Sequence, residues 1–349
     1  KQSRVLSFGA RIADDGRLVE HKVFVAMLQN VHKVSYRGAD EVLAGSTTSS
    51  ASPEVVRTIQ TLNRFAMTRK KYREARGAAV AQFPEPMLRV QSGGKVSVVL
   101  DNKESASRSL VEEMMILAGE VAAEYAKRHK IPIPYRVQEA SDPLPSTPAS
   151  RNSKSAASSA SASSSSGSAA AASSSSSSSF SFAYAARVMA AAQQTGSQKP
   201  AFMDTIPRRH ASIGLDAYVQ VTSPIRRYCD LLAHHQLKSH LRCPGDPLPF
   251  SSYDILTYRD VYESSVRQVE TLQQSSVRYW LLKHMEDRNA AAAPLKALIL
   301  PRPGTASLIA GDVVSVFLMD YAFRVFTKLS RPHEYGDIIT VTITRIDSV

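Results

Sequence analysis

Apolar and polar positions alternate with the period of a β-strand near the amino end of the chain. Residues 5, 6 and 8 and then 18, 19 and 23–25 are apolar, and a polar Asp-Asp-Gly sequence at 14–16 separates the two runs. Two short runs joined by such a turn are typical of a β-hairpin, because aspartate and glycine readily adopt the backbone angles of a tight turn. We therefore predict a hairpin within residues 1–45.

Two helices and a strand follow in the pattern. Residues 53–76 place apolar side chains on one face and many basic side chains on the other, which is typical of a surface helix. Residues 110–129 form a longer apolar helix, which must end before Pro132 because proline cannot continue it. The short apolar run at 96–100 predicts a strand between the two helices.

The pattern changes from helical to β-like near residue 294. Before it, residues 231–241 and 253–287 have helical spacing. After it, short β-rich runs recur with glycine and proline between them, at 297–300, 313–318, 323–326 and 338–346. Regularly spaced short strands are typical of a small antiparallel barrel. We therefore predict an α+β part at 1–290 and a separate barrel at 294–349.

A low-complexity segment interrupts the first part. Residues 141–179 are rich in serine, alanine and proline, and they end in an unbroken run of serines at 173–179. Such a segment buries too little apolar surface to offset the entropy cost of ordering it. We predict a disordered insertion in a surface loop and not a domain boundary.

Composition narrows the class of partner. The chain has 43 basic against 31 acidic residues and a net charge of +12, which favours a polyanionic partner such as nucleic acid or an anionic membrane surface. Its two cysteines argue against a disulfide framework and for a reducing compartment. No apolar run reaches the roughly 20 residues that span a bilayer. The first residues resemble neither a signal nor a transit peptide and lack a methionine, so we expect a fragment.

The most informative stretch is Thr-Ser-Pro-Ile-Arg-Arg-Tyr-Cys-Asp at 222–230. Pro224 fixes its own φ, so we expect a helix to start here with Arg226 and Arg227 in or near its first turn. Backbone N–H groups at a helix start favour anions, and two guanidiniums there suit the phosphates of a nucleic acid. The competing interpretation is ordinary surface charge paired with acids such as Asp230.

This string resembles the most diagnostic motif of the ribonuclease II/R family of 3′→5′ exoribonucleases. Residues 7–45 resemble that family's strand, turn, strand and Tyr-bearing helix. Residues 107–136 resemble its central helix with the following Pro-Tyr-Arg segment, and 276–285 resemble its last helix. The sequences "EMMILAGEV", "IPIPYR" and "VRYW" are most similar to the cyanobacterial and plant-organelle branch.

The resemblance covers nearly the whole chain except residues from about 141 to 200. It implies an α+β fold, namely a fragment of the ribonuclease II catalytic domain with a mixed sheet and long helices. A shortened OB-fold domain, a small β-barrel that binds RNA, would follow at 294–349.

The resemblance also implies a role for each matching residue. Arg226 matches the family's catalytic arginine, which would stabilise negative charge on the phosphoryl oxygens in the transition state. The other matching residues are expected to contact RNA: Tyr36 by the 3′ end, Glu113 by the terminal ribose, and His210, Ser223 and Arg227. Helix packing is the alternative for Tyr36, and a solvated helix charge is the alternative for Glu113.

The predicted barrel would bind single strands through a basic groove and stacking aromatic rings. Arg324 and Lys328 are the expected RNA-binding basic residues there. Tyr321, Phe323 and Phe326 could stack on bases, although Phe323 and Phe326 alternate with polar residues and suit a barrel core at least as well.

Metal ligands are the missing part of the resemblance. In the family a divalent metal is held by aspartates with spacing like Asp-x-Asp-Asp, because hard cations prefer carboxylate oxygens. The one adjacent Asp pair in the sequence, at 14–15, lies in the predicted turn. Adjacent His234 and His235 would face different directions on a helix and have no third ligand spaced with them. We therefore expect Mg²⁺ as the cofactor, with ligands upstream of this chain and none within it.

The resemblance thus predicts part of a metal-dependent 3′→5′ exoribonuclease that acts on single-stranded RNA and releases nucleoside 5′-monophosphates. This chain is expected to be inactive alone and to need an upstream half of the same protein as its partner. The competing interpretation is a degenerate, non-catalytic RNA-binding member of the family. Gln273, where many bacterial members carry glutamate, favours it, and the intact Arg226 motif opposes it. The organelle-like branch suggests a chloroplast or mitochondrion, and no membrane partner is expected.

Overall fold

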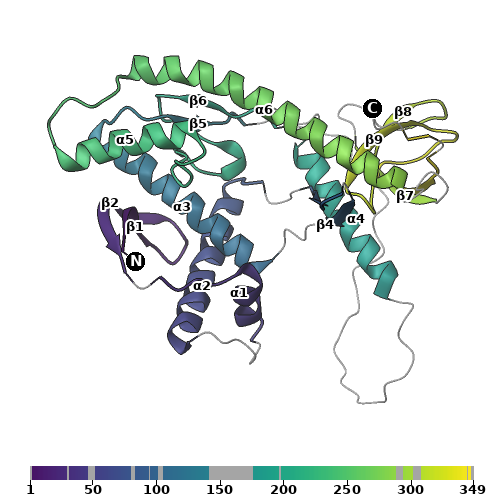
Figure 1. Ribbon diagram of the computed structural model, residues 1–349, viewed down its shortest axis with the longest axis horizontal. Coiled ribbons are helices and arrows are strands. Elements are labelled where there is room, and N and C mark those ends of the chain that lie inside the picture. The colour runs from purple at the N-terminus through teal and green to yellow at the C-terminus, as the bar shows by residue number, and fades with distance from the viewer. Residues whose placement is uncertain are drawn as a thin grey trace. The chain divides into compact units, whose positions relative to one another are not determined.

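The computed structural model shows two compact units (Figure 1). The described residues are 2–29, 31–45, 52–79, 83–93, 95–100, 105–140, 176–195, 198–287, 294–301, 308–343 and 345–346. The first unit combines residues 1–80, 102–141 and 198–279, and the second combines 81–101, 142–197 and 280–349. The predicted division into a catalytic part and an OB domain at 290–294 stays a prediction, and the two compact units follow a different division.

The predicted amino-terminal hairpin is confirmed. β1 (Ser3–Ile12) pairs antiparallel with β2 (Leu18–Leu28), and Gly16 in the connecting turn has a φ of +90°. A Cβ atom at this position would also lie 2.8 Å from the carbonyl oxygen of Thr68. The turn therefore needs glycine both for its backbone angle and for its close approach to a helix.

Serine caps start the first three helices. The helices are α1 (Tyr36–Leu43), α2 (Pro53–Ala75) and α3 (Ala106–His129), and their caps are Ser35, Ser52 and Ser105. Each serine side chain accepts a hydrogen bond from the backbone N–H three residues further on, which satisfies a donor that the helix leaves free. α3 ends at Lys130 in the left-handed conformation, directly before the Ile-Pro-Ile-Pro sequence. The helices predicted at 53–76 and 110–129 are confirmed.

Two buried ion pairs join α2 to α3. Arg69 has no exposed surface and pairs with Glu120. Arg73 binds Glu113 through both Nε, at 3.0 Å, and Nη2. The predicted basic, solvent-facing side of α2 is thus partly buried, because carboxylates of α3 neutralise its arginines.

The core of the first unit lies beneath the arginine motif. β5 (Tyr135–Val137) pairs antiparallel with β6 (Phe202–Asp204), and α5 (Tyr228–Arg242) packs on the same cluster. The buried side chains of this cluster are Ala122, Ala123, Ala126, Ile131, Ile133, Tyr135, Val137, Ala217, Val219, Val221, Ala233 and Leu237. A short 3₁₀ helix (Ala211–Ile213) precedes the segment at 217–221, and this core fixes that segment directly before the motif.

The α+β fold class is confirmed, with sheets that are small. α6 (Ser252–Asp287) is the longest described helix and confirms the helix predicted at 253–287. The ladders between the described strands are antiparallel, and parallel pairing among the described residues is limited to the bridge between Gln138 and His210. In place of one mixed sheet, the described residues form three two-stranded sheets and one four-stranded sheet. Within the described residues, we find no helix with the length and apolar character needed to cross a bilayer.

The second unit is built on a four-stranded antiparallel sheet. Its strands are β7 (Leu295–Ile299), β8 (Val313–Leu318), β9 (Phe323–Lys328) and β10 (Ile338–Val341), in the order β10-β7-β8-β9. All four predicted β-runs form strands. β9 and β10 are the two edges of this sheet and do not pair with each other in the described residues.

A hairpin and a helix from earlier in the chain pack with this sheet. β3 (Pro86–Val90) pairs with β4 (Val96–Leu100), the strand predicted at 96–100. α4 (Ser176–Thr195) buries Ala185 and Val188 against Leu298 and Phe317. Residues 141–175 of the predicted insertion lie outside the described residues. The final four serines of that insertion are helical, because α4 begins at Ser176.

Candidate functional site

The arginine motif forms a tight turn directly before α5. The carbonyl oxygen of Ser223 accepts hydrogen bonds from the backbone N–H of Arg226 at 3.2 Å and of Arg227 at 3.0 Å. The helix begins at Tyr228, and Arg227 at its cap position has extended backbone angles. The helix predicted at this motif is confirmed, with its first residue four positions after Pro224: the proline opens a turn, and both arginines lie directly before the first helical turn.

Asp230 holds this turn in place from inside the first turn of α5. Its Oδ2 atom accepts hydrogen bonds from the backbone N–H of Ser223 at 2.8 Å and from Arg227 Nε at 3.1 Å and Nη2 at 2.8 Å. The residue is fully buried, and Arg227 also donates to the Thr222 hydroxyl at 3.2 Å. Asp230 thus orients the Arg227 side chain, and the pairing with this acid that the competing interpretation expects is found for Arg227.

The Arg226 side chain, unlike that of Arg227, has no partner among the described residues. The residue is exposed, and its side chain makes no hydrogen bond or ion pair with any residue that the structure describes. The preceding Ile225 is 97% exposed, so the tip of the turn projects into solvent. A guanidinium with five free donors suits a phosphate oxygen, whereas two of the three guanidinium nitrogens of Arg227 are already bound to Asp230.

Glu113 is not the solvated helix charge that was its alternative. It is 2% exposed, and both carboxylate oxygens are bound by Arg73. An RNA hydroxyl would have to displace Arg73 to reach this carboxylate. The side chain as placed therefore joins two helices, and the predicted ribose contact has no support from its position.

His210 is likewise a packed residue. It is 6% exposed, its ring meets that of Tyr218 edge-on at 5.9 Å, and its Nδ1 atom lies 3.4 Å from the Ser212 hydroxyl. Burial, with a smaller effect from Arg136, lowers the pKa of His210 to about 4. The ring is therefore neutral at neutral pH, and its predicted contact with RNA stays a prediction.

Tyr36 and Ser223 remain accessible. Tyr36 is the first residue of α1 and is 52% exposed, with the Arg108 guanidinium 5.6 Å from its ring centroid. The ring is thus open for stacking on one side. Ser223 is half-buried, and its hydroxyl bonds no residue in the described part of the chain.

The two phenylalanines of β9, for which the sequence allowed either stacking on bases or packing in the core, lie on opposite faces of the strand. Phe323 faces the core of the second unit, whereas Phe326 is 73% exposed. The outward positions of the strand are Arg324, Phe326 and Lys328. Two basic side chains thus flank an exposed ring on one strand face, as a single-stranded nucleic acid requires. The Arg324 guanidinium also lies 5.1 Å from the ring centroid of Phe83.

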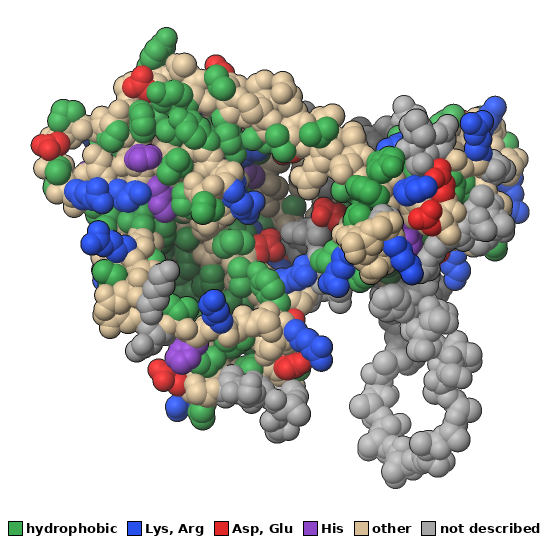
Figure 2. Space-filling view, viewed as in Figure 1, with side chains coloured by type: hydrophobic (Ala, Val, Ile, Leu, Met, Phe, Trp, Pro, Cys, Tyr) green, Lys and Arg blue, Asp and Glu red, His purple; other side chains and the backbone are tan. Residues whose placement is uncertain are grey.

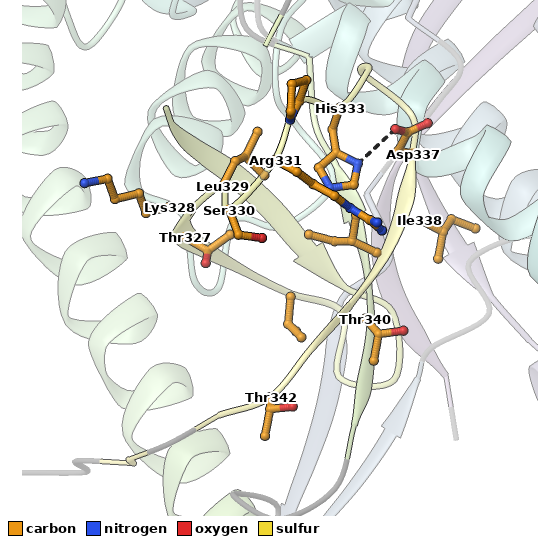
Figure 3. A pocket seen from close by; sticks show the side chains of 13 residues that line it. Thr327, Lys328, Leu329, Ser330, Arg331, His333, Asp337, Ile338, Thr340 and Thr342 are labelled. Atoms are coloured by element: carbon orange, nitrogen blue, oxygen red, sulfur yellow. Dashed lines mark hydrogen bonds and ion pairs between the residues drawn. The ribbon is translucent and has the colours of Figure 1, made fainter. Parts of the chain in front are cut away.

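A groove lies between the two edge strands of this sheet (Figure 3). Its volume is about 920 Å³, and it is lined by residues 327–333 and 337–342. Figure 3 shows Arg331 beside His333, whose Nδ1 atom lies 3.2 Å from Asp337. Lys328 at its rim links the groove to the basic face of β9. Figure 2 shows other lysine and arginine side chains at many separate places on the visible face.

The described residues do not fit a metal centre. No group of three or more His, Cys, Asp or Glu side chains among them is placed to hold an ion. Within the adjacent histidine pair, Nε2 of His234 lies 2.7 Å from the Val221 carbonyl oxygen, and the ring of His235 packs edge-on against Phe250.

Sequence reasoning missed a group of polar residues behind the motif. Tyr218 is 8% exposed, and Arg136 of β5 lies 3.8 Å from Glu263 of α6. Arg136 acts together with Arg227 of the motif, since the charges of both arginines act to lower the pKa of Tyr218 and of Tyr262. The signal was present, because Tyr218 comes four residues before the motif and Arg136 ends the Pro-Tyr-Arg sequence.

Comparison with known proteins identifies the family. A family model described as the RNB domain matches residues 1–243. The chain therefore belongs to the RNB-domain family, as the motif resemblance implied.

Relatives of this family are named as ribonucleases. An uncharacterized ribonuclease of Synechocystis is 30% identical over 280 residues, which cover 80% of this chain and 36% of that protein. Ribonuclease II, chloroplastic/mitochondrial, of Arabidopsis thaliana is 27% identical over 349 residues, which cover 97% of this chain and 37% of that protein. The chain thus spans little more than a third of the length of these relatives.

Solved structures share the fold. Mycoplasma genitalium RNase R, solved with ribose-methylated single-stranded RNA, has a TM-score of 0.72 at 16% identity and matches 100% of this chain and 56% of its own. Yeast Ssd1, described as a pseudonuclease, has a TM-score of 0.57 at 15% identity over 94% of this chain and 39% of its own. The same fold thus occurs in a nuclease and in a protein described as a pseudonuclease.

Proposed function

We propose that this chain supplies the arginine-bearing part of a 3′→5′ exoribonuclease that acts on single-stranded RNA and releases nucleoside 5′-monophosphates. The observation that carries the proposal is the exposed, uncommitted guanidinium of Arg226. It stands on a turn that Asp230 and Arg227 fix from below. A donor held in this way can meet developing charge on a phosphoryl oxygen without first breaking an ion pair of its own.

Arg226 and Arg227 have different roles in this proposal. Arg226 donates to the non-bridging oxygens of the phosphodiester that is cut. Arg227, held by Asp230 and Thr222, braces the turn and adds positive potential for the neighbouring phosphates. The Ser223 hydroxyl, at the base of the turn, is a further donor to the RNA backbone.

RNA would meet this chain at two further places. The open ring of Tyr36 can stack on a base near the 3′ end. On the second unit, Arg324, Phe326 and Lys328 form a face that can bind a single strand. Both contacts combine a π-face or a cation with an unpaired strand, which gives binding with little dependence on sequence.

Hydrolysis itself needs groups from outside the described residues. We propose Mg²⁺ as the cofactor, held by carboxylates of an upstream part of the same protein, and Mg²⁺ would supply the activation of water. The chain alone is then an RNA-binding half that does not cleave. Relatives named as chloroplastic or mitochondrial support an organelle as the location of the whole protein.

A second candidate is a non-catalytic RNA-binding protein of the same family. It is favoured by the lack of a metal-binding group among the described residues and by the shared fold of yeast Ssd1, a pseudonuclease. In this case the motif would serve binding alone. The intact, exposed Arg226 favours the enzyme.

RNA binding by the chain is the direct test of the part that both candidates share. Affinity for a 5′-labelled single-stranded RNA would be measured at two salt concentrations for the unmodified chain, Arg226→Ala and Arg57→Ala. Arg57 is an exposed arginine of α2, so its variant controls for the loss of one surface charge. We expect Arg226→Ala to weaken binding several-fold and to reduce the salt slope by about one, as for a lost phosphate contact. Equal effects of the two variants would contradict a specific role for the turn.

A further inference from the structure

The ring of Tyr218 is fixed by the core of the first unit. It meets the ring of His210 edge-on at 5.9 Å and packs with Ile116 and Leu215. Gly119 of α3 lies so close that a Cβ atom there would be 2.3 Å from Cε2 of the tyrosine ring. A side chain held on three sides points its hydroxyl in one direction, at little entropy cost to a later contact.

The hydroxyl of this ring has no partner. It makes no hydrogen bond with any of the described residues. The hydroxyls of Tyr184 and Tyr335 are fully buried and also have no partner among the described residues, but the Tyr218 hydroxyl is not fully buried. The oxygen therefore keeps contact with solvent, although the residue is only 8% exposed. A largely buried tyrosine normally bonds its hydroxyl to a protein group, whereas this hydroxyl is left to water, which a ligand can replace.

The groups around the hydroxyl show which kind of partner is missing. Arg227, Arg73 and Arg136 all act on it, with Asp230 as the opposing charge. Asp230 accepts three hydrogen bonds through Oδ2, and its Oδ1 atom bonds none of the described residues. Arg73 is bound by Glu113, and the Arg136 guanidinium lies 3.8 Å from Glu263. Burial above all raises the pKa of the Tyr218 phenol, so it stays protonated and donates. Three cationic side chains against one carboxylate act at this position, which favours an anionic acceptor such as a phosphate as the ligand of the donating phenol.

We propose that the Tyr218 hydroxyl is an RNA ligand, which donates a hydrogen bond to a phosphate oxygen of the strand bound at the Arg226–Arg227 turn. The inference rests on the proposed function and adds a contact to it. The arginines attract the backbone by charge, and the fixed phenol sets where one phosphate lies. Tyr218 would thus position the strand relative to Arg226.

Tyr218→Phe tests the proposal, because it removes the hydroxyl and keeps the packed ring. Tyr125→Phe is the matched control, since this tyrosine of α3 is also partly buried, with its ring 4.4 Å from that of His129. Affinities for a 5′-labelled single-stranded RNA and for DNA of the same sequence would be measured with the full chain, together with the urea midpoint of each variant. We expect Tyr218→Phe to bind both strands about tenfold more weakly, the loss of one hydrogen bond to a charged oxygen. Tyr125→Phe should bind as the unmodified chain does.

Other results would overturn the inference in distinguishable ways. Unchanged affinity in Tyr218→Phe, with weakened binding in Arg226→Ala, would remove the phenol from the site and leave the proposed function standing. A loss confined to RNA would place the hydroxyl on the ribose and refute the phosphate contact. A lower urea midpoint with unchanged affinity would assign the hydroxyl to the fold. If the unmodified chain does not bind RNA, the proposed function itself fails.

Discussion

Asp230→Asn is the change whose cost follows most directly from the structure. The carboxylate is fully buried and binds Arg227 through two hydrogen bonds. A hydrogen bond to a charged group contributes about 1.5–3 kcal/mol and a neutral one about 0.5–1.5 kcal/mol, so each bond loses about 1 kcal/mol. The amide nitrogen would also occupy the position of Oδ1, which has no partner among the described residues. Together these effects predict a loss of about 3 kcal/mol in the free energy of unfolding.

Urea unfolding followed by far-ultraviolet circular dichroism measures this loss. The same substitution in an Arg227→Ala background completes a double-mutant cycle, and we expect a coupling energy of at least about 1 kcal/mol. Asp216→Asn is the control, because Asp216 pairs with Arg76 and Arg209 while 67% of its side chain is exposed. An exposed pair of this kind contributes about 0–1 kcal/mol.

The reasoning also predicts a functional effect. Without its carboxylate anchor the turn at 222–227 loosens, so RNA affinity should fall along with stability. A loss of under about 0.5 kcal/mol in Asp230→Asn would refute the account of the turn, because it would mean that the buried charge does not hold Arg227. An equal cost with and without the Arg227 side chain would refute it as well.

Further predictions follow from buried and exposed pairs in the two units. Glu113→Gln should lower the free energy of unfolding by about 3–5 kcal/mol, because it leaves Arg73 buried and unpaired, and unchanged stability by urea titration would contradict this. The lowered pKa of His210, about 4 against an ordinary 6.5, contributes about 3 kcal/mol above pH 6.5 that is lost as pH falls toward 4. Urea midpoints between pH 7.5 and 4.5 should therefore fall more steeply for the unmodified chain than for His210→Gln, and parallel curves would refute this. Phe326→Ala should weaken RNA binding by about 1–3 kcal/mol without loss of stability. Phe323→Ala should lower the free energy of unfolding by about 2 kcal/mol. The reverse pattern in binding and melting experiments would contradict the assignment of these two residues to opposite faces of β9.

Local patterns predicted most secondary structure because each element carries its own signal. The Asp-Asp-Gly turn defines the first hairpin, and the Ile-Pro-Ile-Pro sequence ends α3 close to the predicted residue. The serines that cap α1 to α3 are equally local. Such signals act within a few residues, so the sequence alone contains them.

Predictions failed where a contact between distant residues decides the outcome. Nothing local shows that Glu113 meets Arg73, which is forty residues away in sequence, and so burial replaced the expected solvated charge. The exact first residue of α5 could not be predicted, because Asp230 reaches back to Ser223 and thereby favours a turn over an earlier helix start. The Phe323–Phe326 question needed the register of β9 against β8, since alternation alone does not say which face is buried.

The central claim is that Arg226 belongs to an active site whose metal ligands lie in another part of the protein. Release of mononucleotides from a 5′-labelled single-stranded RNA with Mg²⁺ would be compared for the chain alone, the chain mixed with the upstream segment encoded by its gene, and the same mixture carrying Arg226→Ala. The account predicts release by the mixture, none by the chain alone, and a loss of at least a hundredfold with the substitution. Binding without cleavage in the complete mixture would contradict it and identify a non-catalytic RNA-binding member of the family.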